Sequence, residues 1–166
     1  MMKATRRLLV TMLLLSAGAG GAAVAEDAAK PAPAAGPGSA AKPEMAKIDW
    51  AAMKKGERKQ YMRKQVLPAA KKLFGAFDAK KYKNVTCQTC HGAKGVDSGS
   101  YKMPNPEIAK LPTTPDAFKE LKAKKPEMVK FMAEEVKPHM AALLGMPEWT
   151  PQTPNGYGCY GCHQKL

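Results

Sequence analysis

The sequence predicts a small, mainly helical domain with long loops, built from two similar units. Stretches rich in Ala, Lys, Glu and Met dominate residues 47–166, and no segment shows the sustained period-2 alternation of β-branched residues that is typical of strands. Gly, Pro and Asn gather in 92–113 and 145–158, which we expect to be loops. A segment in the first half of this region resembles one in the second half, which indicates an internal duplication.

The first 25 residues have the pattern of a secretory signal peptide. A basic start precedes an apolar run over 8–15, and Ala23-Val24-Ala25 supplies a cleavage site of small residues. The apolar run is far shorter than the ~20 residues of a spanning helix, so we expect no stable membrane insertion. The protein is therefore expected to be exported to the periplasm, with cleavage near Ala25–Glu26.

Residues 26–46 are almost entirely Ala, Pro, Gly and Lys, a composition that predicts a disordered linker. Residues 47–166 then have the length of one compact domain. Ile, Leu, Val and Phe make up only about 15% of that domain, below the ~20% under which a highly charged chain is usually disordered. A large apolar cofactor would supply the missing core, as structural metals do in other small domains.

Three helices are expected in the domain, over about 57–77, 115–125 and 126–144. Thr114 is a suitable N-cap for the second helix, and Pro115 suits its first position, where a missing amide hydrogen costs nothing. Gly145 can adopt the left-handed conformation that commonly ends a helix, so we expect it to cap the third.

The first and third helices contain a repeated pattern at an offset of 70 residues. Tyr61–Gly75 aligns with Phe131–Gly145, and five of the fifteen positions are identical. The identical pairs are Met62 and Met132, Val66 and Val136, Pro68 and Pro138, Leu73 and Leu143, and Gly75 and Gly145. Proline lacks the amide hydrogen and crowds the preceding turn, so each helix should break or kink near Val66–Leu67 or Val136–Lys137.

All four cysteines lie in two Cys-x-x-Cys-His pentapeptides. The residues are Cys87, Cys90 and His91 in the first, and Cys159, Cys162 and His163 in the second. This pattern is the attachment signature of c-type haem. Cysteines three apart share one face of a helical turn, so each can form a thioether to a haem vinyl group, and the adjacent histidine can bind the iron as proximal ligand. The sequence therefore predicts two haem c groups, in repeat units of about 56–103 and 126–166.

Three other interpretations of the cysteines compete with haem. A four-cysteine zinc site would leave both histidines unused. Two disulfides would suit an exported protein but would again leave the histidines unexplained. A thioredoxin-like redox pair would need an alternation of strands and helices that the sequence lacks.

The sixth ligand of each iron must come from elsewhere in the chain. His139 is the only other histidine, so at most one haem can have two histidine ligands. Methionine is the next candidate, and the repeat partners Met62 and Met132 are the distal ligands that we favour. Met103 is the rival for the first haem, and Met140 or His139 for the second. Methionines at helical spacing are also typical of adaptable packing, and His139 fits a solvated helix position equally well.

At the two pentapeptides the chain resembles small dihaem c-type cytochromes of bacterial periplasms. The order of ligand-bearing helix, turn and then Cys-x-x-Cys-His is similar to the haem units of the cytochrome subunit of photosynthetic reaction centres. A signature close to the C-terminus is similar to that of cytochrome c-prime. The resemblance covers about 47–166 as architecture, and it implies a helical dihaem domain.

These features favour a periplasmic electron carrier, not an enzyme. The net charge of +13 predicts acidic redox partner proteins, which would bind in weak, salt-sensitive encounters. The alternative is a dihaem enzyme or sensor, peroxidase-like or gas-binding, with one open haem iron and an acid or base such as His139, Glu134 or Glu135 above it. Nucleic acid is not expected as a partner, because the chain carries an export signal and lacks aromatic residues interleaved with the basic ones.

Overall fold

The computed structural model describes residues 44–166, so the expected signal peptide and most of the expected linker lie outside the described residues. The described part is mainly helical, with long loops and isolated β-bridges but no strand, which confirms the predicted mainly α class. None of its helices is both long and apolar enough to cross a membrane.

The first expected helix is a continuous helical rod with a widened turn in its middle. It consists of α1 (Lys55–Tyr61), the π-helical turn η1 (Met62–Val66) and α2 (Leu67–Phe77), and the junctions keep right-handed helical backbone angles. The Leu67 amide donates to the Met62 carbonyl, five residues back, as a π turn requires. The proline at position 68 therefore widens the preceding turn and does not end the helix.

The second and third expected helices also form. α4 (Pro115–Lys124) begins as expected, with the Thr114 hydroxyl oxygen accepting a hydrogen bond from the Ala117 amide at 3.4 Å. α5 (Pro126–Phe131), η2 (Met132–Val136) and α6 (Lys137–Leu143) form the second rod. Gly145 follows α6 with a φ of +65°, and its amide donates to the Ala142 carbonyl at 3.1 Å, so it takes the expected capping conformation.

The structural repeat coincides with the sequence repeat. Each π turn begins at the repeated methionine and ends at the repeated valine, two residues before the repeated proline. In η2 the Lys137 amide donates to the Met132 carbonyl, which matches the bond in η1. The two rods thus share one irregularity at the same offset, and each irregularity begins at a repeated methionine.

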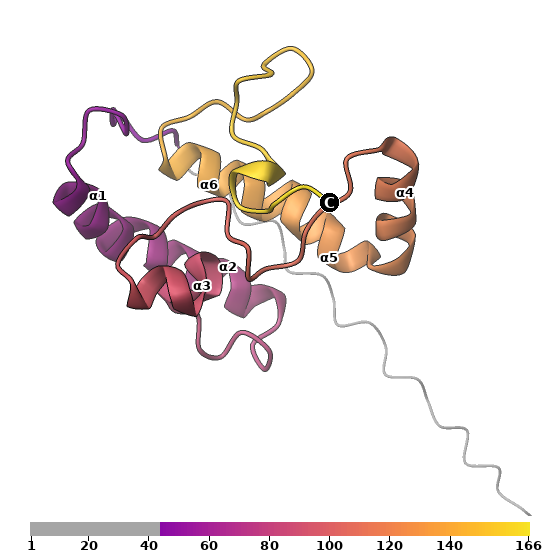
Figure 1. Ribbon diagram of the computed structural model, residues 1–166, viewed down its shortest axis with the longest axis horizontal. Coiled ribbons are helices and arrows are strands. Elements are labelled where there is room, and N and C mark those ends of the chain that lie inside the picture. The colour runs from indigo at the N-terminus through magenta and orange to yellow at the C-terminus, as the bar shows by residue number, and fades with distance from the viewer. Residues whose placement is uncertain (1–43) are drawn as a thin grey trace, which may run out of the picture. The chain divides into compact units, whose positions relative to one another are not determined.

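The two rods cross with opposite direction (Figure 1). The Tyr61 hydroxyl donates to the Leu143 carbonyl at 2.7 Å, which joins the end of α1 to the end of α6. Phe131, the repeat partner of Tyr61, stacks on Phe77 with a centroid distance of 4.1 Å and an interplanar angle of 9°. η1 packs against α6, and η2 against α2, so the two π turns lie in the centre of the contact.

The hydrophobic core between the rods is small. Its buried side chains are Val66, Ala70, Leu73, Phe74, Val85, Phe131 and Met140. Met62 and Met132 are partly buried and pack against this cluster. Since few large apolar side chains are buried, the interior agrees with the low apolar content of the sequence, and completion of the core by a cofactor stays a prediction.

One helix extends into an expected loop. α3 (Cys87–Asp97) continues past the first signature, so the expectation of a loop from residue 92 is wrong for its first residues. Gly92, with a φ of +72°, interrupts the helix, and the Glu107 carboxylate then accepts hydrogen bonds from the amides of Ala93 and Lys94 at 3.1 and 3.0 Å. This distant carboxylate caps the second part of α3, which no local pattern indicates.

Candidate functional site

Each Cys-x-x-Cys-His motif forms a single helical turn. The first motif opens α3, where the Thr86 amide donates to the Thr89 hydroxyl oxygen at 3.0 Å and so defines the start of the helix. The second motif contains the 3-10 turn η3 (Cys159–Gly161), and the His163 amide donates to the Cys159 carbonyl at 3.0 Å. All four cysteines are free thiols, so no disulfide joins them. In each motif the two cysteines therefore lie three residues apart on one helical turn.

The two motifs are joined by a segment of the loop that follows α3. The Asn105 amide donates to the Cys162 carbonyl at 2.9 Å, and the Leu111 amide donates to the Gln164 carbonyl at 2.9 Å. Residues 105–111 thus run parallel to 163–165, through two isolated β-bridges. The Asn105 side chain also donates to the carbonyl of Cys90 at 2.9 Å, so this segment contacts both signatures.

The cysteine thiols are close enough to influence one another. The pKa of Cys90 is raised to about 11, mainly by burial and in addition by the negative charges that Cys162 and Cys87 would carry. Burial also raises the pKa of Cys162, although the hydroxyl of Tyr157, 2.9 Å from its sulfur, acts in the opposite direction. Cys90 and Cys162, the second cysteine of each motif, are therefore neutral at physiological pH, and the two motifs lie close enough to interact electrostatically.

His163 has the geometry of a metal-binding imidazole. Its Nδ1 lies 2.7 Å from the Ala109 carbonyl, and a carbonyl can only accept, so Nδ1 carries the proton. Nδ1 is therefore engaged by the main chain, which leaves Nε2 as the ring nitrogen that can serve as a ligand, and a hydrogen bond from the other ring nitrogen to a carbonyl is typical of histidines that bind metal. This observation fits the residue to a haem iron.

His91 is held differently. Its Nδ1 is buried without a hydrogen-bond partner, and the Tyr101 ring packs edge-on against it at a centroid distance of 5.4 Å. Burial lowers the pKa of His91; the main chain of Tyr101 opposes this shift but does not reach the geometry of a hydrogen bond. The imidazole is therefore neutral near pH 7, which is the form that binds a metal.

The expected distal ligands occupy different environments. Met62 and Met132 begin the two π turns and pack against the same core, whereas Met103 is half-buried in the loop after α3. Met140 belongs to the core itself, with 8% of its surface exposed. His139 is buried, and its Nδ1 lies 2.7 Å from the Glu135 carbonyl, so the solvated alternative for this residue is wrong. Its burial follows from the packing of α6, whose residues 138–142 are all buried.

Tyr157 links the second signature to this core. Its ring packs against the hydrophobic cluster that also contacts Met62 and Met132, and its hydroxyl reaches the sulfur of Cys162. Burial raises its pKa, so the hydroxyl stays protonated. Sequence reasoning missed Tyr157 and Asn105, because a tyrosine two residues before a signature and an asparagine between two prolines carry no recognisable pattern.

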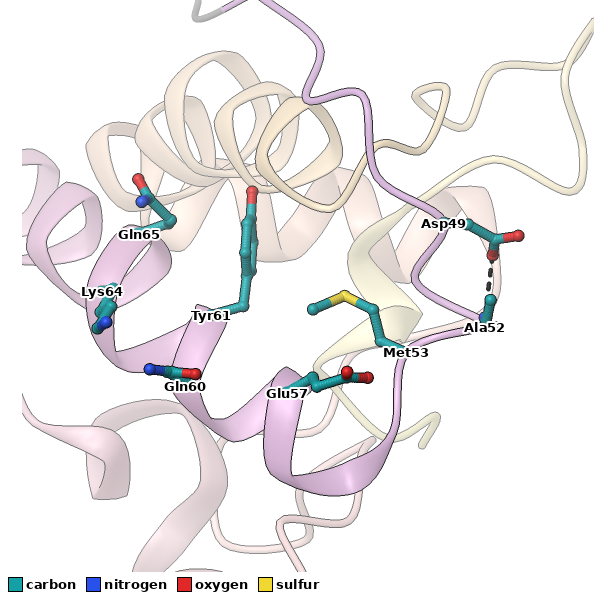
Figure 2. Close-up of a pocket in the computed structure, with 8 residues that line it drawn as sticks. All are labelled: Asp49, Ala52, Met53, Glu57, Gln60, Tyr61, Lys64 and Gln65. Atoms are coloured by element: carbon teal, nitrogen blue, oxygen red, sulfur yellow. Dashed lines mark hydrogen bonds between the residues drawn. The ribbon is translucent and has the colours of Figure 1, made fainter.

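A surface cavity lies away from both signatures. It has a volume of about 570 Å³ and is lined by residues of α1, of η1 and of the segment before them, none of which belongs to a signature (Figure 2). At its rim the Ala52 amide donates to the Asp49 carboxylate at 3.0 Å. Over residues 44–166, no three Cys, His, Asp or Glu side chains converge so as to hold a metal ion by themselves.

Comparisons with protein families, with curated proteins and with solved structures find no match for this chain.

Proposed function

We propose that this protein is an exported electron carrier with two covalently bound c-type haems. The observation that carries the proposal is the pair of Cys-x-x-Cys-His motifs, which use every cysteine and each form one helical turn. The neutral imidazole of His91 and the available Nε2 of His163 support their role as proximal ligands. Zinc or disulfide formation would give these histidines no role.

Haem iron, when bound, supplies one-electron chemistry, and the chain sets its potential and exposure. Two cysteines would anchor each macrocycle, and Met62 and Met132 are the proposed distal ligands, because both begin a π turn that faces the shared core. π turns inside helices are frequent at functional sites. A thioether ligand raises the reduction potential relative to a second histidine, which suits an electron carrier.

Two features support electron exchange with proteins in the periplasm. The thiols of the two signatures lie close enough to shift each other's pKa, so haems attached there would be neighbours. The net charge of +13 favours acidic redox partners, which would be attracted over several ångströms and released easily at physiological salt.

The first test is the haem content of the mature protein, produced in a host that attaches haem c. We expect two haems per chain by the pyridine haemochrome assay and a near-infrared band of methionine ligation. Cys87→Ala and Cys159→Ala should each lose one haem and much of the helicity seen by circular dichroism, because the interior then lacks a large apolar group. Gln88→Ala, at an exposed position inside the first motif, is the control and should keep both haems. Colourless protein, or zinc bound by the four sulfurs, would contradict the proposal.

Carbon monoxide distinguishes the carrier from the alternative enzyme or sensor. An electron carrier with two closed irons should show no spectral change when the reduced protein meets the gas. A change equivalent to one haem would favour the alternative, for which the buried His139 and Glu135, with the His139 Nδ1 4.0 Å from the Glu135 carboxylate, are the candidate acid and base.

A further inference from the structure

Asn105 is the most deeply buried polar residue in the described part of the chain. None of its surface is exposed, and it lies in a loop between two prolines. An amide side chain at such a depth is costly unless its donors and acceptor are satisfied. Its partners therefore indicate what holds it there.

Both signatures supply those partners at equivalent positions. The main-chain amide of Asn105 donates to the Cys162 carbonyl, and its side-chain Nδ2 donates to the Cys90 carbonyl, each at 2.9 Å. In each motif the accepting carbonyl belongs to the second cysteine, directly before the proximal histidine. One residue thus fixes the peptide from which each histidine projects.

The rest of the loop reinforces this contact. The Asn105 side-chain oxygen accepts from the Glu107 amide at 2.8 Å, and the Glu107 carboxylate caps the part of α3 that follows the first signature. Further along, the Ala109 carbonyl accepts from His163, and the Tyr160 hydroxyl donates to the Pro112 carbonyl. Residues 105–112 therefore hold both signature turns, and Asn105 is the point at which they meet.

We propose that Asn105 is a positioning residue that fixes the two signature turns in one relative placement and thereby sets the mutual orientation of the two haems. The inference rests on the proposed function in one respect, namely that each signature turn carries a haem. The connection between the turns is a property of the chain itself, so it can be tested separately.

The test compares three variants of the mature protein as isolated. Asn105→Asp keeps the side-chain acceptor but loses the donor to Cys90, and Asn105→Ala loses both. Asn155→Asp makes the same chemical change at an exposed loop position near the second signature and is the matched control. Two neighbouring haems at a fixed angle give a two-signed Soret circular dichroism signal, which reports their mutual orientation. Hydrogen exchange reports the order of the turns with or without haem.

We expect both Asn105 variants to retain two haems, to lose most of the two-signed Soret signal, and to exchange faster in 87–97 and 159–166 together. The control should match the wild type in each measurement. An unchanged Soret signal in both variants, or faster exchange in only one signature segment, would overturn the inference. If Asn105→Asp unfolds, because its carboxylate is buried opposite the Cys90 carbonyl, Asn105→Ala, which removes the contact without adding a charge, decides the outcome. Wild-type protein without haem would instead refute the proposed function, and the exchange data would still test the connection.

Discussion

At the scale of single residues, the site depends on Gly92, where an added side chain would overlap neighbouring atoms. Gly92 has a φ of +72° between the first signature and the second part of α3. A Cβ atom there would lie 2.5 Å from a Glu107 carboxylate oxygen and 2.9 Å from the Asn105 side-chain oxygen. The same glycine therefore permits the backbone turn and the approach of the loop that contacts both motifs.

Gly92→Ala should destabilise the protein for both reasons. A left-handed conformation costs a non-glycine residue about 1–2 kcal/mol, and displacement of the Glu107 and Asn105 side chains adds the loss of their exposed and part-buried hydrogen bonds, about 1 kcal/mol. Gly99→Ala is the matched control, because Gly99 has a φ of +66° but nothing within 4 Å of an added Cβ. Chemical denaturation of both variants separates the two costs, and equal stabilities would show that the contacts at Gly92 are unimportant.

At the scale of elements, the repeated π turns connect sequence to site. Pro68 and Pro138 cannot donate a hydrogen bond, and in both rods the preceding turn widens to include one more residue. The sequence predicted a disturbance at these positions but not its form, because a proline can equally kink or end a helix. The widened turn holds Met62 and Met132 against the core.

Pro68→Ala tests whether the π turn positions Met62. Alanine restores the amide hydrogen, so the π turn can become a regular α-helical turn. An α turn contains one residue fewer than a π turn, so the residues before it, Met62 included, would rotate about the helix axis by about 100° relative to α2. We expect both haems to remain attached, and we expect the intensity of the near-infrared band of methionine ligation to fall by the contribution of one haem. Pro126→Ala is the control, since Pro126 occupies a first helical position where no hydrogen bond is regained. A full band in Pro68→Ala would exclude a role for this turn in ligation.

The same scale shows how far the sequence predicts the fold. Helical composition, the Thr114 cap and the Gly145 terminus are local features, so the three helices and their caps could be predicted from the sequence. The second part of α3 could not, because Glu107 caps it from a loop more than ten residues away. The signature residues of the site were predicted from spacing alone, whereas Asn105 and Tyr157 act through contacts that only the folded chain creates.

At the scale of the whole molecule, exposed lysines lie along the chain just before the first proposed haem site. In the segment that ends at the first signature they are Lys71, Lys72, Lys80, Lys81 and Lys83. The one acidic residue among them, Asp78, accepts hydrogen bonds from the amides of Lys80 and Lys81 at 3.0 and 2.8 Å. A cavity of about 420 Å³ opens between Lys71, Tyr82 and Lys83 on this surface.

Electron transfer from an acidic partner should therefore depend on these lysines more than on total charge. The double variant Lys80→Glu and Lys81→Glu should slow reduction by a small acidic redox protein roughly tenfold at low salt, because steering contributes 10 to 10³ in association rate. Lys119→Glu with Lys122→Glu, on α4, makes the same change in net charge at other exposed positions and should slow it less. The difference in reduction rate between the two double variants should vanish above about 0.5 M salt, where screening acts within a few ångströms.

The control is stopped-flow reduction by a neutral small molecule, whose rate should be unaffected in both double variants. Equal slowing of the reaction with the acidic protein in the two double variants would indicate that net charge alone attracts the partner.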